Sequence, residues 1–551
     1  MIAPTFTLDG LCPVTTHHAL HRAVTIGPDV EAIVTARERV TFRELAANAA
    51  AITRALNAHG VRKGDHVAVC LGNGARWVEI FLAVTALGAV VVPVNTRFRA
   101  DEMAHVLKQS RSSLLITADA FLRVDFIGML CQIAPGVDAP FGAGDLPELP
   151  DLGSVVVVGT NTPAGARQWN DFLADGSNLP AALPKAEPDD VALIQYTSGT
   201  TSFPKGVLLT HRSLCANGFF SGGRLGLRIA DRFHSARPFF HVAGSSLSVL
   251  ACIQHVCTLV TMDRFEPGET LRLFEEERCT HFSGNDTIAL MILGHPDVRT
   301  RRLYLRGAWV AATSSIVRQV IDVLGATECV VGYGLSEASP NVAQSCWWEP
   351  EEVRVSTAMR IEPGVEVRIS SLGDGGTLPT GERGEIQVRG WNVMQGYFDL
   401  PEQTRSAVDD DGWLHTGDVG YLDSDGRLVF TGRTKELIRV GGENVAPAEV
   451  EDILHKHPDI RQAVVIGVAD PRLIEVPFAF VQLTENRHLD RDDLAQWCKQ
   501  HMAGFKIPRH IHFVADFESI GMTASGKVRK TDAVITANAL LTSEPAVESR
   551  R

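Results

Sequence analysis

Short apolar runs alternate with amphipathic helical stretches past residue 300, and this alternation constrains the fold more than any other feature. In the first helical stretch, Thr41 and Glu44 have the spacing of a capping box, and apolar residues recur every three or four positions until Gly60. A strand-like run, a helical run and a second strand-like run follow at 66–71, 76–87 and 89–94. This order predicts a parallel sheet covered by helices.

The texture of the chain changes further along. The stretch 142–188 is rich in Gly, Pro, Asp and Asn around one apolar run, 155–158, and predicts a loop-rich connection between two α/β halves. Short β-like runs at 365–369, 385–388 and 427–430 indicate a small antiparallel sheet or barrel. From 436 onward, a helix (447–455), two strands (463–467 and 476–483) and a helix opened by Asp490 predict a compact α+β unit of about 115 residues. The predicted fold class is α/β: a large N-terminal body of two α/β subdomains with a small β-barrel-like unit, and a small mobile α+β C-terminal domain.

Charge and composition exclude several classes of protein. The 551 residues include 52 basic and 65 acidic side chains, with a net charge of −13 and 45% hydrophobic residues. These values argue against disorder, and the acidic balance disfavours a nucleic-acid binder, which needs basic surface. The longest apolar stretches, 83–94 and 247–262, are too short to span a bilayer, and no signal peptide is visible. Ten scattered cysteines without a CxxC pair predict reduced, mostly buried thiols in a cytoplasmic protein without a zinc site.

The segment 196–206, YTSGTTSFPKG, carries the most specific chemistry and follows an apolar run at 191–195. Its small hydroxyl residues and glycines allow N–H and O–H groups to converge on phosphate oxygens, and Lys205 adds a positive charge. It differs from a Walker loop because Pro204 stands where that pattern has Gly, and no Ser or Thr follows the Lys. The segment predicts a polyphosphate-binding loop.

Together with five further motifs, this loop resembles the adenylate-forming enzymes, which include acyl-CoA synthetases, stand-alone adenylation domains and beetle luciferases. The motifs span nearly the whole chain: GYGLSEA (332–338), GEIQVRG followed by MQGY (384–397), WLHTGD (413–418), GRTKELIRVGGENVAPAEVE (432–451) and TASGKVRK (523–530). The resemblance to the acyl-CoA synthetase branch implies an AMP-forming acid:CoA ligase that uses ATP, Mg²⁺ and CoA. The acid would attack the α-phosphorus of ATP, pyrophosphate would leave, and the acyl group would then pass to the CoA thiol.

The resemblance also implies roles for single residues. Lys205 and its loop would hold the β and γ phosphates, and Glu337 would bind Mg²⁺. Tyr333 would stack on adenine, while Asp418 and Arg433 would hold the ribose. The predicted nucleotide contacts are Thr197, Ser198, Gly199, Thr200, Thr201, Lys205, Ala312, Thr313, Tyr333, Gly334, Ser336 at the α-phosphate, Asp418 and Arg433, with Thr200 as a second metal ligand.

The C-terminal motifs imply that one site performs both half-reactions by domain alternation. Lys527 is expected to bridge the substrate carboxylate and the α-phosphate during adenylation. Lys435 lies where the family has its hinge, so the predicted domains are 1–432, which binds AMP, and 433–551, a mobile lid. Rotation of the lid would withdraw Lys527 and bring Gly441 and Gly442 to a pantetheine tunnel.

His241, in PFFHVAG, stands where CoA-forming members place a gating residue between acid pocket and thiol tunnel, and is predicted to be catalytic with Lys527 and Glu337. The segment 239–241 offers no carboxylate for a substrate ammonium, which disfavours an amino acid. Small-acid relatives have Trp where this chain has Gly334, so we expect a roomy, mostly apolar pocket for a long-chain, aryl or polycyclic acid. The predicted pocket residues are Phe240, His241, Gly244, Ser245, Asn285, Ala311, Gly332, Gly334 and Ala338.

Three departures from the family pattern leave more than one function open. Ser202 replaces a Gly of the phosphate loop, 311–313 reads Ala-Ala-Thr where GGAP is usual, and Gly521 stands where Pro is common. A loop Gly often has a conformation that costs other residues about 1 kcal/mol. Impaired adenylation would leave an enzyme that makes thioesters only from a supplied acyl-adenylate. Acyl transfer to a carrier protein, luciferase-like oxygenation and non-catalytic binding of an acyl-adenylate also stay open, as does a homodimer.

Overall fold

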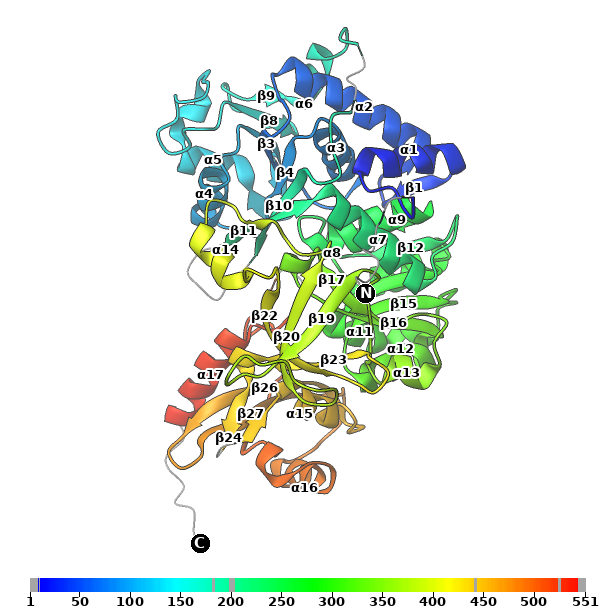
Figure 1. Cartoon of the computed structure of the whole chain (residues 1–551), viewed down its shortest axis with the longest axis vertical. Coiled ribbons are helices and arrows are strands. Elements are labelled where there is room, and N and C mark those ends of the chain that lie inside the picture. The colour runs from blue at the N-terminus through cyan, green and yellow to red at the C-terminus, as the bar shows by residue number, and fades with distance from the viewer. Residues whose placement is uncertain are drawn as a thin grey trace.

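Two large sheets and a separate C-terminal unit organise the chain (Figure 1). The structure is a computed structural model that describes residue 8 and residues 10–180, 184–197, 204–440, 443–523 and 527–543. In Figure 1 the elements coloured blue to green form the large body, and the orange and red elements form a smaller unit at its lower end. This division matches the predicted class of a large α/β body followed by a small α+β unit.

The first sheet has eight strands in the order β21-β11-β10-β4-β3-β5-β8-β9. The strands from β10 to β9 along this order are parallel, whereas β11 and β21 are antiparallel to their neighbours. The bounds are β3 (His66–Cys70), β4 (Val90–Pro93), β5 (Leu114–Ala118), β8 (Ser154–Val158), β9 (Arg167–Gln168), β10 (Val191–Thr197), β11 (Lys205–Thr210) and β21 (Gly396–Tyr397). The prediction of a parallel sheet in this region is confirmed.

The two helical stretches predicted in this half, which start at residues 41 and 76, are confirmed. α2 (Phe42–Ala58) has the predicted capping box, in which the Thr41 hydroxyl accepts from the Glu44 N–H and the Glu44 carboxylate accepts from the Thr41 N–H. The other helices are α3 (Ala75–Ala86), α4 (Ala100–Gln109), α5 (Phe126–Ile133) and α6 (Trp169–Asp175). The stretch 142–188 differs from the expectation of a connection between halves, because β8, β9 and α6 make it the edge of this sheet.

The second sheet has nine strands in the order β18-β17-β16-β15-β14-β12-β13-β1-β2, parallel from β16 to β1. The strands are β1 (Glu31–Val34), β2 (Arg39–Thr41), β12 (Arg232–Ser235), β13 (Thr258–Val260), β14 (His281–Asn285), β15 (Gly307–Ala311), β16 (Glu328–Gly334), β17 (Asn341–Gln344) and β18 (Arg360–Ile361). Its helices are α1 (Thr16–Ile26), α7 (His211–Leu225), α8 (Val242–Gly244), α9 (Ala251–His255), α10 (Pro267–Glu276), α11 (Asp286–Leu293), α12 (Ser314–Leu324) and α13 (Glu351–Val355). One continuous apolar core joins the two sheets, with Trp77, Phe239 and Phe282 among its largest side chains.

A small antiparallel sheet connects this body to the C-terminal unit. It consists of β19 (Val365–Ser370), β20 (Gly384–Gly390), β22 (Leu414–Leu422) and β23 (Leu428–Arg433), with α14 (Pro401–Ala407) between β21 and β22. The sequence left a small antiparallel sheet and a barrel open, and the structure shows the sheet, with four strands and open edges.

The C-terminal unit contains its own five-stranded sheet and two apolar clusters. The strands are β24 (Ile438–Val440), β25 (Glu443–Val445), β26 (Ile460–Asp470), β27 (Ile474–Leu483) and β28 (His510–Phe513), and the helices are α15 (Pro447–Leu454), α16 (Arg491–His501) and α17 (Lys530–Ser543). The Asp490 carboxylate caps α16 by accepting from the Asp493 N–H, as the sequence predicts. The apolar residues of both clusters lie between 438 and 541, so this unit has a core of its own.

The sequence predicts mostly buried, unpaired cysteines and apolar stretches too short to span a bilayer. All ten cysteines are free, and all but Cys12 and Cys131 are buried. Within the described ranges, no helix is both long and apolar enough to cross a membrane.

Candidate active site

Tyr333, Asp418 and Arg433 lie far apart in sequence and meet in one cluster. Tyr333 on β16 donates a 2.8 Å hydrogen bond from its hydroxyl to Oδ2 of Asp418 on β22. Arg433 is the register partner of Asp418 on β23, and its Nε lies 3.2 Å from Oδ1 of Asp418. The three residues predicted to hold adenosine are therefore neighbours.

Burial shapes the electrostatics of this cluster. It raises the pKa of Asp418, and the positive charge of Arg433 opposes that rise. The pKa of Tyr333 is well above its usual value, mainly because the side chain is buried and secondly because of the negative charge of Asp418. The Tyr333 ring stacks on Phe430 of β23, with ring centroids 5.2 Å apart. Sequence reasoning missed Phe430, which is 36% exposed in the structure.

A second cluster surrounds the two ends of the predicted phosphate loop. Thr197 ends β10 and pairs in register with Lys205, which begins β11. The Lys205 ammonium lies 4.9 Å from the ring centroid of Tyr397, and the Tyr397 hydroxyl donates to Oε1 of Glu337 at 2.9 Å. Tyr397 belongs to the MQGY motif, but sequence reasoning gave it no role.

Part of the predicted phosphate and thiol machinery lies outside the described residues. This applies to Ser198, Gly199, Thr200, Thr201, Ser202, Gly441 and Gly442. The Thr200 metal contact, the effect of Ser202 and the glycine-lined thiol tunnel therefore stay predictions.

His241 lies between β12 and α8, where its Nδ1 accepts a 3.2 Å hydrogen bond from the Ala243 N–H. Burial lowers the pKa of His241 to about 4, with further contributions from the positive charges of Arg237 and Lys527. By its accessible surface the residue as a whole is nevertheless exposed to solvent. His241 is neutral at pH 7, and Lys527 lies close enough for its charge to act on the ring.

Several contacts hold the C-terminal unit against the body with Lys527 at this position. The Arg97 guanidinium donates to the Thr523 carbonyl oxygen at 3.2 Å, and Thr523 accepts from the Lys527 N–H through its hydroxyl at 3.0 Å. The Ser315 hydroxyl donates to Oδ1 of Asp452 at 3.2 Å. An ion pair joins Arg383 to Glu449 at 2.5 Å. Lys435 lies in a short 3-10 helix, Thr434–Glu436, that connects β23 to β24.

The predicted acid-pocket residues cluster at the carboxyl ends of parallel strands, where α/β folds commonly bind ligands. Asn285 and Ala311 end β14 and β15, Gly332 and Gly334 lie near the end of β16, and the other members are Phe240, Gly244, Ser245 and Ala338 in adjoining segments. Ala312 and Thr313 follow β15, and Ser336 lies in a short helix, Ser336–Ala338, after β16. The strand order thus brings together residues that the sequence separates by nearly 100 positions.

The pocket glycines have a different role from the one expected. A Cβ on Gly332 would lie 2.4 Å from the Trp309 ring, and one on Gly334 would lie 1.9 Å from the carbonyl oxygen of Pro340. A Cβ on Gly244 would lie 2.1 Å from the Pro238 carbonyl oxygen. These positions allow close packing of neighbouring groups and are not vacant space, because backbone or an indole ring already fills the volume beside each. Sequence reasoning missed Trp309.

The chain matches the model of the AMP-binding enzyme family over residues 20–398, and that of the AMP-binding enzyme C-terminal domain over residues 449–527. The chain belongs to the AMP-binding enzyme family. It is 34% identical to the putative acyl-CoA synthetase YngI of Bacillus subtilis, over 91% of this chain and 93% of that protein. It is 35% identical to a 3-[(3aS,4S,7aS)-7a-methyl-1,5-dioxo-octahydro-1H-inden-4-yl]propanoyl:CoA ligase of Rhodococcus jostii, over 94% of this chain and 98% of that protein.

A solved structure adds to this comparison. The anthranilate CoA ligase AuaEII in complex with anthranoyl-AMP matches with a TM-score of 0.83 and 25% identity, over 98% of this chain and 99% of that one. The predicted family, fold and AMP-forming acid:CoA ligase activity are confirmed, with ATP, CoA and a carboxylic acid as substrates.

Proposed function

We propose that the protein activates a bulky carboxylic acid as its adenylate and transfers the acyl group to CoA in the same site. The observation that carries the proposal is the contact of the C-terminal segment with the body. Arg97 donates to the Thr523 carbonyl oxygen and the Thr523 hydroxyl accepts from the Lys527 N–H, which places the Lys527 charge where it acts on His241. The Rhodococcus relative is named for a propanoyl chain on a bicyclic dione, and AuaEII binds anthranoyl-AMP. Both acyl groups are bulky, which supports a bulky acid here.

Adenosine binding rests on the Tyr333 cluster. An ionised carboxylate has about four lone-pair sites, so Asp418 can accept from the ribose hydroxyls while it accepts from Tyr333. Burial raises the pKa of that carboxylate, and the positive charge of Arg433 opposes this rise and so favours the ionised form. Tyr333 and Phe430 supply aromatic surface for adenine.

We propose that the reaction uses Mg²⁺, and the residues at the site fit this ion. Glu337 offers one carboxylate oriented by Tyr397. No cluster of three metal-binding side chains occurs in the part of the chain that the structure describes. A lone carboxylate suits Mg²⁺, which is commonly held by one or two carboxylates together with substrate phosphates and water. The ion would neutralise charge on the phosphate oxygens.

The two steps then follow from the position of the C-terminal unit. In the first, a carboxylate oxygen of the acid attacks the α-phosphorus and pyrophosphate leaves, while Lys527 stabilises the developing negative charge. In the second, the unit rotates about Lys435, the CoA sulfur attacks the acyl carbon and AMP leaves. His241 is neutral in the described arrangement and separates the acid from the thiol path without adding a charge.

The compartment is a further part of the proposal. The ten free cysteines support a reducing environment, because thiols of exported proteins are commonly paired. We therefore keep the cytoplasm as the proposed location.

Product analysis tests the proposed function. The full chain is incubated with ATP, Mg²⁺, a panel of acids and either CoA or a pantetheinylated carrier protein, and AMP, pyrophosphate and thioester are quantified by mass spectrometry. We expect equimolar AMP, pyrophosphate and acyl-CoA with bulky acids. A clear preference for acetate or propionate contradicts the bulky substrate. Thioester from a supplied acyl-adenylate, without pyrophosphate release from ATP, favours an enzyme that performs thioester formation alone.

A further inference from the structure

Arg237 is a half-buried cation beside the predicted acid site that sequence reasoning did not single out. It lies four residues before His241 in the loop between β12 and α8. Its guanidinium carbon is 4.1 Å from the ring centroid of Trp309, and Nη2 donates to the Gly284 carbonyl oxygen over a long 3.4 Å. Nη1 is buried, and no acceptor among the described residues lies within hydrogen-bond distance of it.

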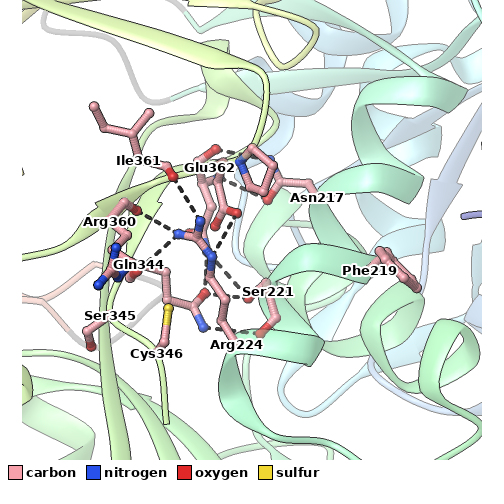
Figure 2. Close-up of polar contacts among 12 residues, drawn as sticks. Asn217, Phe219, Ser221, Arg224, Gln344, Ser345, Cys346, Arg360, Ile361 and Glu362 are labelled. Atoms are coloured by element: carbon pink, nitrogen blue, oxygen red, sulfur yellow. Dashed lines mark hydrogen bonds and ion pairs between the residues drawn. The ribbon is translucent and has the colours of Figure 1, made fainter. Parts of the chain in front are cut away.

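The charge of Arg237 is also uncompensated. Burial alone lowers its pKa to about 9, and it forms no ion pair with a carboxylate of the described ranges. Arg224 on α7 shows how this chain satisfies a buried guanidinium, since its Nε lies 3.4 Å from Glu362 (Figure 2). The other Arg224 nitrogens donate to the backbone carbonyl groups of Gln344, Arg360 and Ile361. A buried guanidinium without such partners is costly, which indicates a partner that the chain does not supply.

Arg237 and Lys527 are held by different parts of the body. Arg237 contacts Gly284 on β14 and Trp309 on β15 of the second sheet. The Lys527 backbone is hydrogen-bonded to Thr523, whose carbonyl oxygen accepts from Arg97 after β4 of the first sheet. The positive charges of both lower the pKa of His241. The Trp309 ring, which packs under the Arg237 guanidinium, lies against Gly332, a predicted pocket residue. Arg237 is therefore at the acid site but separated from the Lys527 end, where the reacting carboxylate is proposed to lie.

The surroundings hold Arg237 in place. The Asn73 side chain donates to the Arg237 carbonyl oxygen and accepts from the Phe239 N–H, each at 2.9 Å. The Trp309 indole N–H donates to Oε1 of Gln344 at 3.0 Å, so the ring under the guanidinium is fixed as well. Gln344 belongs to the polar network of Figure 2. A donor held this firmly loses little entropy when it binds a ligand.

We propose that Nη1 of Arg237 binds an oxygen acceptor, a ketone or a second carboxylate, that the substrate acid carries away from its reacting carboxylate. This inference rests on the proposed acid:CoA ligase function and narrows its substrate class. The pocket then accepts a bulky apolar skeleton that bears one polar oxygen group at its far end. Because a site built to bind such a group is left with an unpaired donor when the group is missing, it discriminates against the plain hydrocarbon analogue.

A matched acid panel tests the inference. The full chain is assayed for acyl-CoA formation with saturated acids from hexanoate to dodecanoate, each beside its keto counterpart and its ω-carboxylate counterpart. At the optimal length we expect kcat/KM to be about tenfold or more higher for an oxygen-bearing acid than for the plain acid. A keto preference identifies a neutral acceptor, and a dicarboxylate preference identifies an anionic one. Both outcomes support the inference.

Variants separate recognition from folding. Arg237→Met is expected to reduce the advantage of the oxygen-bearing acid about tenfold or more, mainly through KM, whereas Arg237→Lys keeps the charge and part of the advantage. Arg302→Met is the matched control, because Arg302 also lies over an aromatic ring, that of Tyr304, but is exposed to solvent. Stabilisation of each variant by ATP reports an intact fold.

Two results overturn the inference while the proposed function stands. One is wild-type enzyme that forms acyl-CoA from plain acids at every length at least as well as from their oxygen-bearing counterparts. The other is a folded Arg237→Met enzyme that keeps the wild-type ratio. If Arg237→Met does not fold, the inference is judged from the ratio of kcat/KM for the oxygen-bearing acid to kcat/KM for the plain acid, measured for the wild type and for Arg237→Lys. Failure to form acyl-CoA or pyrophosphate with any acid counts against the proposed function.

Discussion

At the scale of single residues, the buried carboxylate of Asp418 joins the side chains of the proposed nucleotide site. It accepts from the Tyr333 hydroxyl and faces Arg433 across the β22–β23 ladder. The motif resemblance predicted that these three residues act together, and the structure shows that they are neighbours. Their contact with the nucleotide stays a prediction. The resemblance could not reveal Phe430 or Trp309, because their ring contacts depend on how strands and loops pack in three dimensions and have no motif of their own.

Asp418→Asn tests the ribose contact. An amide keeps the shape of the side chain but replaces one acceptor oxygen with a donor and removes the negative charge that Arg433 faces. We expect KM for ATP to rise about tenfold to hundredfold, with a smaller change in KM for the acid. Tyr333→Phe is the control, since it keeps the ring and removes only the hydroxyl donor. Equal increases in both KM values would show that Asp418 acts through the fold instead.

Glu362 gives a prediction about pH and stability. Burial raises its pKa from 4.5 to about 7 against the opposing charge of Arg224. Between these two pH values, folded protein keeps a proton that unfolded protein has lost, so this group lowers the free energy of unfolding as pH rises through the window. The Gln side chain of Glu362→Gln cannot ionise, so the variant does not lose this part of its free energy of unfolding, roughly 3 kcal/mol, as pH rises.

Thermal melts across the pH range check this prediction. The melting temperature of Glu362→Gln, measured relative to wild type, should rise from about pH 5 to about pH 8, with most of the rise between the folded and unfolded pKa values. The comparison at each pH cancels the other titrating groups. Parallel melting curves across that range would show that Glu362 ionises in the folded protein near its ordinary pKa.

At the scale of elements, the sequence predicts helix ends that depend only on neighbouring residues. The capping box of α2 and the Asp490 cap of α16 are formed by side chains within three residues, so sequence alone locates them. The edge strand β9 has two residues and α6 has seven, too few for a periodic pattern, and both were missed in 142–188. Pairing with β8, not local propensity, makes β9 a strand.

The short helix Thr434–Glu436 is the element on which domain alternation depends. Lys435→Pro fixes φ at this position and restricts the residue before it, so rotation at the proposed hinge should be hindered. We expect pyrophosphate release with the acid to persist, while thioester formation from a supplied acyl-adenylate falls about tenfold or more. Lys435→Ala, which keeps a flexible backbone, is the control. Equal loss of both steps would place the hinge elsewhere.

At the scale of the whole molecule, the proposal is that a chain with a net charge of −13 binds anionic ATP and CoA through local positive groups. Lys205, Arg433 and Lys527 come from three regions of the sequence, and the surface charge far from the site is screened within about 10 Å. Lys527 reaches the site because Arg97 and Ser315 of the body hold the C-terminal unit. The sequence predicted the lysine by resemblance, but the contacts that position it follow only from the fold.

The central claim is that Lys527 serves adenylation alone, in a site that the C-terminal unit then rearranges for thioester formation. Rapid-quench assays of Lys527→Ala measure the two half-reactions separately, with Lys499→Ala on the exposed face of α16 as the control. We predict that acid-dependent pyrophosphate release falls about hundredfold or more, while acyl-CoA formation from a supplied acyl-adenylate stays within a few-fold of wild type. Equal loss of both steps, or undiminished pyrophosphate release, would contradict the account.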